Sequence, residues 1–306
     1  MKVSVVICTY NRESYLKLCL EGLFKNNEDR SLYEVIVIDN KSTDNTRQIV
    51  ESFKVNEEIR YVYEERVGLS NARNRGINEA NYDIIAYLDD DAIPEKGYIN
   101  NIICGFNEHQ VKCGGGKIIP IWTVDKPQWY SEQFNGVFTI LDCGDKDKVL
   151  DIDYPYGANM FFLKSELIKV GGFNTELGLK GNEIIMGEDD DMFIRFKNKG
   201  HKIWYLSQVA VKHHVPEGKI NKEYVKKRFE AGGEALAKSY SISKSGNEFT
   251  YEYYRWVVKY LFKIIPLYNA SKIIKRNKFE KECLVLLNKG FINTCRKIKI
   301  KEKGEI

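Results

Sequence analysis

The sequence predicts an α/β fold in which a doubly wound, mostly parallel central sheet is followed by a C-terminal helical extension. Two observations carry this prediction. Short β-branched runs alternate with helical patterns through residues 2–89. These runs are apolar on both faces, as parallel strands covered by helices are. In such sheets ligands bind beyond the carboxyl ends of the strands, where Thr9, Asp39 and Asp89 stand.

The first predicted strand covers residues 2–8, and leucines follow it at helical spacing. A second strand, 34–38, leads through a polar turn into a helix that ends near residue 53. Strand 59–63, a helix over 69–80 and strand 83–89 then complete three β-α steps.

The sequence of residues 97–215 predicts a region of mixed helices and strands that completes the same domain. We expect a helix over 97–108, strands near 111–122 and 137–142, a turn over 154–159, a short strand, and a helix from Lys164. A helix between Gly187 and Gly200 opens on four acids, and two strands, 203–206 and 209–214, follow it. Pro216 and Gly218 mark a boundary, so the predicted domains are 1–215 and a basic helical extension, 216–306.

The composition limits the possible classes of protein. Of the 306 residues, 43% are hydrophobic, which is enough for a large core. The seven cysteines include no C-x-x-C pair, which favours a reducing compartment. No apolar run approaches the ~18 residues of a membrane span, so we expect a cytoplasmic protein. Residues 252–306 hold 14 basic and 5 acidic residues, so the excess positive charge lies in the tail and a nucleic-acid partner is not expected.

Two acidic clusters and a histidine pair are candidates for chemistry. The triplet Asp89, Asp90 and Asp91 directly follows an apolar strand. Neighbouring carboxylates repel one another, and a bound cation such as Mg²⁺ or Mn²⁺ offsets this repulsion. The alternative is an acidic turn exposed to solvent. The second cluster, Glu188 to Asp191, opens a helix, where acids often only balance the helix dipole. His213 and His214 are either ligands or structural residues.

Joined in order, these motifs resemble the inverting family 2 glycosyltransferases of the GT-A fold. The blocks that carry the resemblance are VVICTYNR, VIVIDNKSTDNT, GLSNARNRGI, LDDDAIP, YGANMFF with GGFN, GEDDDMFIRFKNKG and KHHVP. The resemblance covers about residues 2–235. The resemblance implies an enzyme that moves a sugar from a nucleotide diphosphate donor, expected to be UDP-linked, to an acceptor hydroxyl.

The resemblance also implies roles for individual residues. Thr9 and Asp39 would contact the base and ribose of the donor. The other residues expected around the nucleotide are Tyr10, Arg12, Asn40, Gly68, Ala72, Arg73, Asp89 and Asp90. Among them, Arg73 can pair with the diphosphate. The implied ligands of Mn²⁺ or Mg²⁺ are Asp91, Asp89 and His213, with His213 matching the pattern better than His214.

In this family the general base comes from a Glu-Asp pair, here Glu188-Asp189, of which Asp189 is preferred. The base removes the proton of the attacking hydroxyl while a metal neutralises the leaving diphosphate, so one displacement inverts the sugar C1. Both acidic motifs (DDD and EDDD) are longer than required, so the register of each is ambiguous by one residue, and the double histidine has the same ambiguity. Residues 252–256 (EYYRW) depart from the Q-x-x-R-W of processive synthases, so a non-processive enzyme of polysaccharide biosynthesis is expected.

The acceptor is expected to be a glycan, a lipid-linked sugar or a protein. An inactive sugar-nucleotide-binding scaffold and a sugar nucleotidyltransferase remain as alternatives. A dinucleotide-dependent oxidoreductase is disfavoured because no G-x-G-x-x-G follows the first strand.

The tail contains an amphipathic pattern that predicts either an anionic membrane surface as partner or a helix docked on the catalytic domain. The apolar face consists of Trp256, Val257, Tyr260, Leu261, Ile264 and Ile265, and Pro266 should end the helix. A basic stripe of Arg255, Lys259 and Lys263 lies beside it. Binding by this face would place the protein at the inner face of the cell membrane.

Overall fold

A computed structural model describes residues 1–54, 58–151, 154–179, 187–243, 245–274 and 277–302. The chain divides into two compact units. The first comprises Met1–Trp122, Thr139–Glu183 and Glu188–Val215, and the second Thr123–Phe138, Ile184–Gly187 and Pro216–Ile306. Residues 303–306 of the predicted extension lie outside the described residues.

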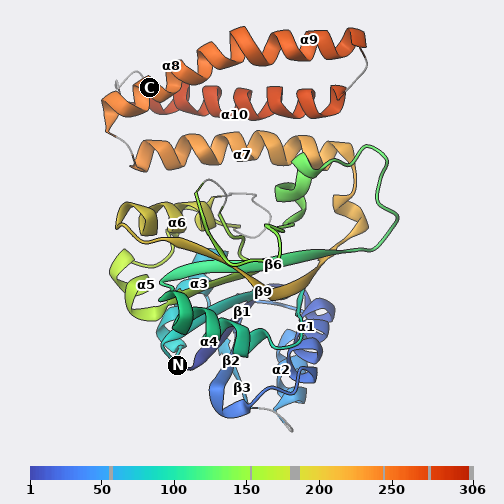
Figure 1. Cartoon of the computed structure of the whole chain (residues 1–306), viewed down its shortest axis with the longest axis vertical. Coiled ribbons are helices and arrows are strands. Elements are labelled where there is room, and N and C mark those ends of the chain that lie inside the picture. Colours follow the sequence, from blue (N-terminus) through green and yellow to red (C-terminus); the bar gives the residue numbers. More distant parts are fainter. Residues whose placement is uncertain (55–57, 152–153, 180–186, 244, 275–276, 303–306) are drawn as a thin grey trace. The chain divides into compact units, whose positions relative to one another are not determined.

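The first half of the sheet is parallel and confirms the predicted fold class. Strands β1 (Val3–Thr9), β2 (Tyr33–Asp39), β3 (Ile59–Tyr63) and β4 (Ile84–Asp89) lie in the order β3-β2-β1-β4, all parallel. Apart from Val62 of β3, which is partly buried, their valines and isoleucines are almost fully buried because helices cover both faces (Figure 1). The helices between these strands are α1 (Glu13–Lys25), α2 (Thr46–Phe53) and α3 (Leu69–Glu79). Parallel pairing brings Thr9, Asp39 and Asp89 to one edge of the sheet.

The second half of the sheet is mixed. Strand β8 (Asn159–Leu163) runs antiparallel to β4 and β6 (Cys113–Trp122), and β9 (Ile203–Val215) runs parallel to β6. Strands β5 (Ala92–Pro94) and β7 (Lys148–Leu150) pair antiparallel with β9. The strands β6 and β9 approach so closely that a Cβ on Gly116 would lie 1.7 Å from the carbonyl oxygen of Val209, which explains the glycine run there.

Two strand predictions in this region were wrong. The expected strand 137–142 is replaced by a 3-10 helix, Glu132–Phe138, and a single bridge between Ile118 and Leu141. The expected strands 203–206 and 209–214 form the single strand β9, in which the register against β6 shifts between Gly116 and Lys117. Such a bulge interrupts the apolar alternation without ending the strand.

Helix α6 (Glu188–Asn198) is fixed to the sheet by aromatic packing. The rings of Phe193 and Phe196 each lie 5.3 Å from the ring of Phe162 on β8. This contact sets the position of the acidic first turn of α6. The remaining helices of the unit are α4 (Tyr98–His109) and α5 (Lys164–Val170).

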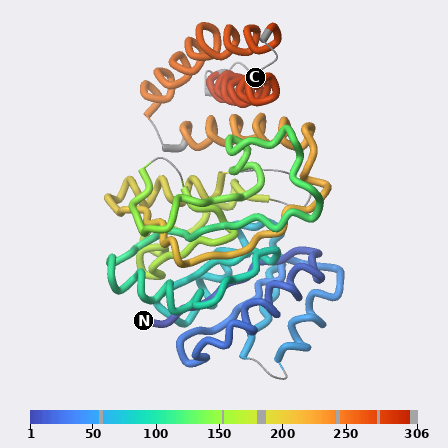
Figure 2. The backbone as a smooth tube through the Cα atoms, turned by 45° about the vertical axis from the view of Figure 1, so that its right-hand side comes forward, coloured from blue at the N-terminus to red at the C-terminus, as the bar shows by residue number. Residues whose placement is uncertain are grey.

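The second unit is helical. It contains α7 (Lys222–Ser243), α8 (Gly246–Lys259), a π-helical turn over Tyr260–Ile264, α9 (Ile265–Ile274) and α10 (Lys278–Glu302). Figures 1 and 2 show α10 between α7 and the run of α8 and α9. A Cβ on Gly233 of α7 would lie 2.0 Å from the Leu287 carbonyl oxygen, and one on Gly290 of α10 would lie 2.3 Å from that of Glu230. These two glycines therefore allow the backbones of α7 and α10 to touch.

The tail helix does not end at Pro266, as the sequence predicted. The helical path passes from α8 through the π-turn into α9, and Pro266 is the second residue of α9. Proline lacks an N–H and its ring crowds the preceding turn, which a wider π-turn just before it relieves. Within the described residues, none of the helices combines the length and apolar character needed to cross a membrane.

Candidate active site

The acidic triplet lies in the short connection between β4 and β5. Strand β4 ends at Asp89 and β5 begins at Ala92, so the three carboxylates extend beyond the carboxyl edge of the sheet. Asp90 and Asp91 are buried, and Asp89 is partly exposed. Desolvation by burial raises the pKa of Asp90 to about 7, and burial also raises the pKa of Asp89. Holding these groups together in ionised form therefore costs free energy that a cation can offset.

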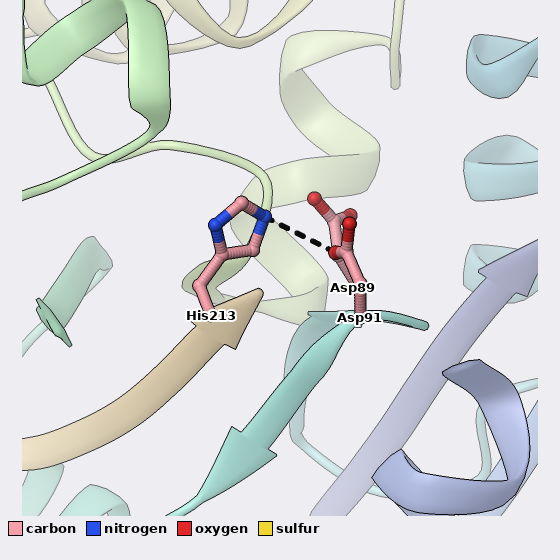
Figure 3. Close-up of side chains that lie close together, drawn as sticks. All are labelled: Asp89, Asp91 and His213. Carbon is pink, nitrogen blue, oxygen red and sulfur yellow. Dashed lines mark ion pairs between the residues drawn. The ribbon is translucent and has the colours of Figure 1, made fainter. Parts of the chain in front are cut away.

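The pairing of β5 with β9 brings His213 to the triplet. Ala92 lies opposite His213, and the N–H of His214 donates to the carbonyl of Asp91 over 3.0 Å. As a result, Nε2 of His213 is 3.1 Å from Oδ1 of Asp91. Figure 3 shows His213 facing Asp89 and Asp91, and one ligand atom from each of the three lies within 4.8 Å of the others.

These three side chains fit a divalent cation. Two carboxylates and one imidazole are a donor set that Mn²⁺ accepts and Mg²⁺ tolerates. Among the described residues, Nδ1 of His213 is a buried nitrogen without a hydrogen-bond partner. The ring is therefore not locked in one tautomer by a second hydrogen bond. The adjacent His214 packs against the ring of Tyr15, at 5.5 Å, which favours His213 as the ligand.

Arg12 and Thr9 bind the other side of the triplet. One guanidinium nitrogen of Arg12 lies 2.8 Å from Oδ1 of Asp90 and the other 2.5 Å from Oδ2 of Asp91. The hydroxyl of Thr9 donates to Oδ2 of Asp90 over 2.8 Å. Asp90 is thus held by neighbouring side chains and lies outside the group of possible metal ligands. That group contains Asp89 and Asp91, which are the two acids of the expected D-x-D motif.

The second acidic cluster meets the first through Arg73. This arginine on α3 is 2% exposed, and its Nη1 donates to Oδ1 of Asp189 over 2.6 Å and to Glu188 over 3.2 Å. Its Nη2 lies 3.9 Å from Oδ1 of Asp89. The N–H of Gly157 donates to the other oxygen of Asp189 over 2.8 Å. Both oxygens of Asp189 therefore have a donor, which fixes the orientation of its carboxylate.

The remaining acids of α6 have different surroundings. Desolvation and the charge of Asp189 raise the pKa of Glu188 to about 7, although Arg73 opposes this shift. Asp191 pairs with Arg195 one turn along the helix, at 2.7 Å. Asp191 is thus directed to its own helix, whereas Glu188 and Asp189 are directed to Arg73.

Asp39 and Asn40 organise the loops at the strand ends. Asp39 is buried, accepts a hydrogen bond from the Ser42 N–H, and accepts another from the Tyr61 hydroxyl over 2.6 Å. Burial and this hydrogen bond raise the pKa of Tyr61. The Asn40 side chain donates to the carbonyls of Glu64 and Arg66 and accepts from the Gly68 N–H. Gly68 has φ of 137°, a conformation that favours glycine.

A cavity of about 240 Å³ lies beside the triplet. The candidate residues that line it are Thr9, Tyr10, Arg12, Asn40, Ala72, Asp89 and Asp90. Asp39, Gly68 and Arg73 are not among its lining residues; they act on residues around it. The sequence did not predict a role in the site for the apolar lining residues Cys8, Val67, Leu69 and Leu179, although Val67 and Leu69 flank the predicted Gly68.

Comparison with known proteins identifies the family. Residues 4–168, more than half of the chain, match the family model "Glycosyl transferase family 2". The chain belongs to glycosyltransferase family 2. This family 2 glycosyltransferase is 27% identical over 221 residues to the glucosyl-dolichyl phosphate glucuronosyltransferase of Haloferax volcanii, covering 71% of this chain and 70% of that protein. It is also 27% identical to glycosyltransferase AglE of the same organism, covering 75% and 71% of the two chains.

Solved structures show the same GT-A fold. The mannosyltransferase PcManGT of Pyrobaculum calidifontis, in complex with GDP-Man and Mn²⁺, has a TM-score of 0.64 and 16% identity over 99% of this glycosyltransferase and 88% of that chain. S. aureus TarS 1–349, in complex with UDP-GlcNAc, has a TM-score of 0.55 and 18% identity over 99% and 92% of the two chains. The predicted family and fold are thus confirmed.

Proposed function

We propose that the chain is a non-processive, inverting glycosyltransferase that moves one sugar from a UDP-linked donor to an acceptor hydroxyl. One observation carries the proposal. Arg73 links the Glu188–Asp189 pair to Asp89, beside the cavity at the carboxyl ends of the strands. A candidate base and a candidate metal site therefore lie next to each other, as a single displacement at a sugar carbon requires.

The donor nucleotide occupies the cavity lined by Thr9, Tyr10, Asn40 and Ala72. Asp39 supports this site by holding Tyr61 and the Ser42 turn. The solved structures with a similar fold include complexes with UDP-linked and with GDP-linked sugars, so a panel of nucleotide sugars must include donors with both nucleobases.

Asp89, Asp91 and His213 would hold Mn²⁺ or Mg²⁺, with the charge of the triplet balanced by Arg12 on its other side. When bound, the metal supplies positive charge for the leaving diphosphate. The chain itself provides Arg12, 34% exposed and at the cavity wall, as a further cation near that charge.

Asp189 takes the proton from the acceptor hydroxyl as that oxygen attacks the sugar C1. Its carboxylate is oriented by Arg73 and the Gly157 N–H, so the position of the base is set before the acceptor binds. Arg73 is a positioning residue in this scheme, since its guanidinium is buried and bound to Glu188 and Asp189. The bond from C1 to the diphosphate breaks as the bond to the acceptor oxygen forms, which inverts C1.

The acceptor is proposed to be a lipid-linked glycan of cell-surface polysaccharide biosynthesis, used at the cytoplasmic side of the membrane. This proposal rests on relatives whose names describe transfer to glucosyl-dolichyl phosphate and chondroitin synthesis. We assign catalysis to residues 1–215 and treat 216–306 as an extension that does not supply reacting groups.

A panel of nucleotide sugars incubated with the full-length protein and Mn²⁺ tests the proposal. We expect release of the nucleoside diphosphate from one donor, faster with an acceptor glycan, and a product of inverted anomeric configuration by NMR. If the protein binds a donor but releases no nucleoside diphosphate with any acceptor tested, it is instead the inactive scaffold. Formation of a nucleotide sugar and pyrophosphate from a nucleoside triphosphate and a sugar phosphate would identify a nucleotidyltransferase.

A further inference from the structure

We propose that an exposed apolar face of α8 and the π-turn binds the surface of an anionic membrane. We call this face the outer stripe; it consists of Tyr251, Tyr254, Val258, Leu261 and Phe262. Their exposed fractions are 67%, 58%, 56%, 53% and 78%. Their spacing of three, four, three and one residues places them along one side of a helix.

The outer stripe is separate from the face that builds the core of the second unit. Phe249, Trp256 and Ile264 are 3%, 8% and 5% exposed. The ring of Trp256 stacks on that of Phe291 of α10 at 4.3 Å. The helix is therefore already anchored on one face, and folding does not explain the apolar residues on the other.

This arrangement corrects the membrane-binding face expected from the sequence. Trp256 is buried in the cluster formed by α7, α8 and α10, and the partly buried Val257 and Tyr260 pack against it, so this face is directed into the unit. Of the six residues of that predicted face, Leu261 is exposed and belongs to the outer stripe. The helix docks on its own unit by one face and presents a second apolar face outward.

The exposed apolar residues continue into α9. Leu267 is 42% exposed and Ile273 is 84% exposed. Because the π-turn keeps the helical path unbroken at Pro266, the stripe and these two side chains belong to one run from residue 246 to 274. Exposed apolar side chains along one side of a helix, such as those of the outer stripe, mark a site of interaction with a partner or a membrane.

The charges around the outer stripe favour an anionic lipid surface as the binding partner. Lys259 and Lys263 are exposed beside the stripe, and Lys272 is exposed on α9. Arg255 is exposed as well, with its charge partly balanced by Glu252 at 2.6 Å. Two copies of this face would bring like charges together, which disfavours a symmetric dimer. An anionic bilayer offers both an apolar layer for Phe262 and negative headgroups for the lysines.

The aromatic residues of the stripe also suit this interface. Tyrosine side chains prefer the headgroup level, where the ring is in contact with lipid and the hydroxyl with water. Tyr251 and Tyr254 stand at one end of the stripe, while Leu261 and Phe262 are the fully apolar side chains at the other. The stripe can thus insert its apolar end and keep its tyrosines at the headgroups.

Co-sedimentation of the full-length protein with vesicles tests the proposal and needs no glycosyltransferase activity. The vesicles are phosphatidylcholine alone or phosphatidylcholine mixed with phosphatidylglycerol. We expect sedimentation with the anionic vesicles at low salt and less at high salt. The double substitution Val258→Ser with Phe262→Ser, which changes no charge, should lower the partition coefficient by at least about tenfold. Ile168→Ser, at a side chain that is also 56% exposed, is the matched control and should bind as the unsubstituted protein does.

A second pair of substitutions, Lys259→Gln with Lys263→Gln, should weaken binding to anionic vesicles and reduce its salt dependence. The proposal is overturned if the unsubstituted protein stays in the supernatant with anionic vesicles at low salt, or if the serine variant sediments equally. It is also overturned if size-exclusion chromatography shows a dimer that the serine substitutions dissociate while no vesicle is bound. Circular dichroism of each variant confirms that the helices are intact.

Discussion

Substituting Asp189 by asparagine tests the assignment of the base most directly. Both oxygens of this carboxylate accept a hydrogen bond, one from Arg73 and one from the Gly157 N–H. An asparagine side chain has one acceptor oxygen and one NH₂ group. The NH₂ group must therefore face either Arg73 or the Gly157 N–H, and one donor is left without an acceptor.

Two magnitudes follow from this geometry. One unsatisfied buried donor costs about 1–3 kcal/mol of stability, which a urea unfolding curve measures. Loss of a general base lowers turnover by about 10²–10⁴-fold, which corresponds to ~2.7–5.4 kcal/mol in the activation barrier. Donor affinity should change little, because Asp189 is not among the residues that line the nucleotide cavity.

The assay pairs initial rates of nucleotide release with the Kd of UDP from titration calorimetry in Mn²⁺. Asp190→Asn is the matched control, one residue along the same helix. The Asp190 side chain is exposed to solvent, so replacing its carboxylate by an amide should change turnover and stability little. The reasoning is refuted if Asp189→Asn abolishes UDP binding, or if Glu188→Gln by itself stops turnover while Asp189→Asn does not.

Four further predictions concern the metal, the positioning residue and stability. Asp91→Asn should remove the gain in UDP affinity that Mn²⁺ gives; equal UDP affinity of the unsubstituted protein with Mn²⁺ and with a chelator would contradict a metal site. Arg73→Lys should lower kcat without raising the Kd of UDP, because a single ammonium cannot reach Asp89, Glu188 and Asp189 together. A large rise in the Kd of UDP would instead show that Arg73 binds the diphosphate. Glu28→Ala should cost about 1–3 kcal/mol in urea unfolding, since Glu28 accepts the N–H groups of Ile99 and Asn100 at the start of α4, and Glu28→Gln should cost less. Burial alone would raise the pKa of Glu34, but hydrogen bonds from Ser4, Asn81 and Arg60 hold this pKa below its usual value. The stabilisation that ionised Glu34 gives is therefore present above the unfolded pKa of about 4.3 and is lost as the pH falls through the folded pKa. The melting temperature of Glu34→Gln should differ from that of the unsubstituted protein at neutral pH, and the two should converge in acid.

The parallel half of the fold could be predicted because local patterns determine it. Each strand from β1 to β4 is an apolar run followed by a helical pattern, and consecutive βα units leave few arrangements. The second half depends on pairings between distant segments. Strand β9 joins β5, β6 and β7, and its bulge opposite Gly116 made one strand resemble two. Residues 137–142 (VFTILD) are apolar enough to imitate a strand, but the first two of them end the 3-10 helix Glu132–Phe138 and only Leu141 forms a bridge.

The candidate metal ligands could be predicted as a group, whereas the contacts of the other candidate residues could not. Asp89, Asp91 and His213 do converge, because β5 and β9 pair in a register that sets Ala92 opposite His213. The family pattern favoured His213 over His214, and the structure agrees, since His213 lies beside Asp91 while His214 packs on Tyr15. The partners of Arg73 could not be foreseen, since Glu188 and Asp189 lie more than a hundred residues further along the chain.

The two arginines explain how the fold tolerates two acidic clusters in one place. Arg12 binds Asp90 and Asp91 on one side, while Arg73 binds Glu188 and Asp189 on the other. Asp89, which is 33% exposed and lies 3.9 Å from Arg73, is the member of the triplet with the weakest contact to either arginine. A divalent cation held by the triplet would therefore contact Asp89 with little competition and would share Asp91 with Arg12. We therefore predict that metal affinity and the position of Arg12 are coupled, and that a nucleotide diphosphate, which brings its own negative charge, would shift the balance towards the metal.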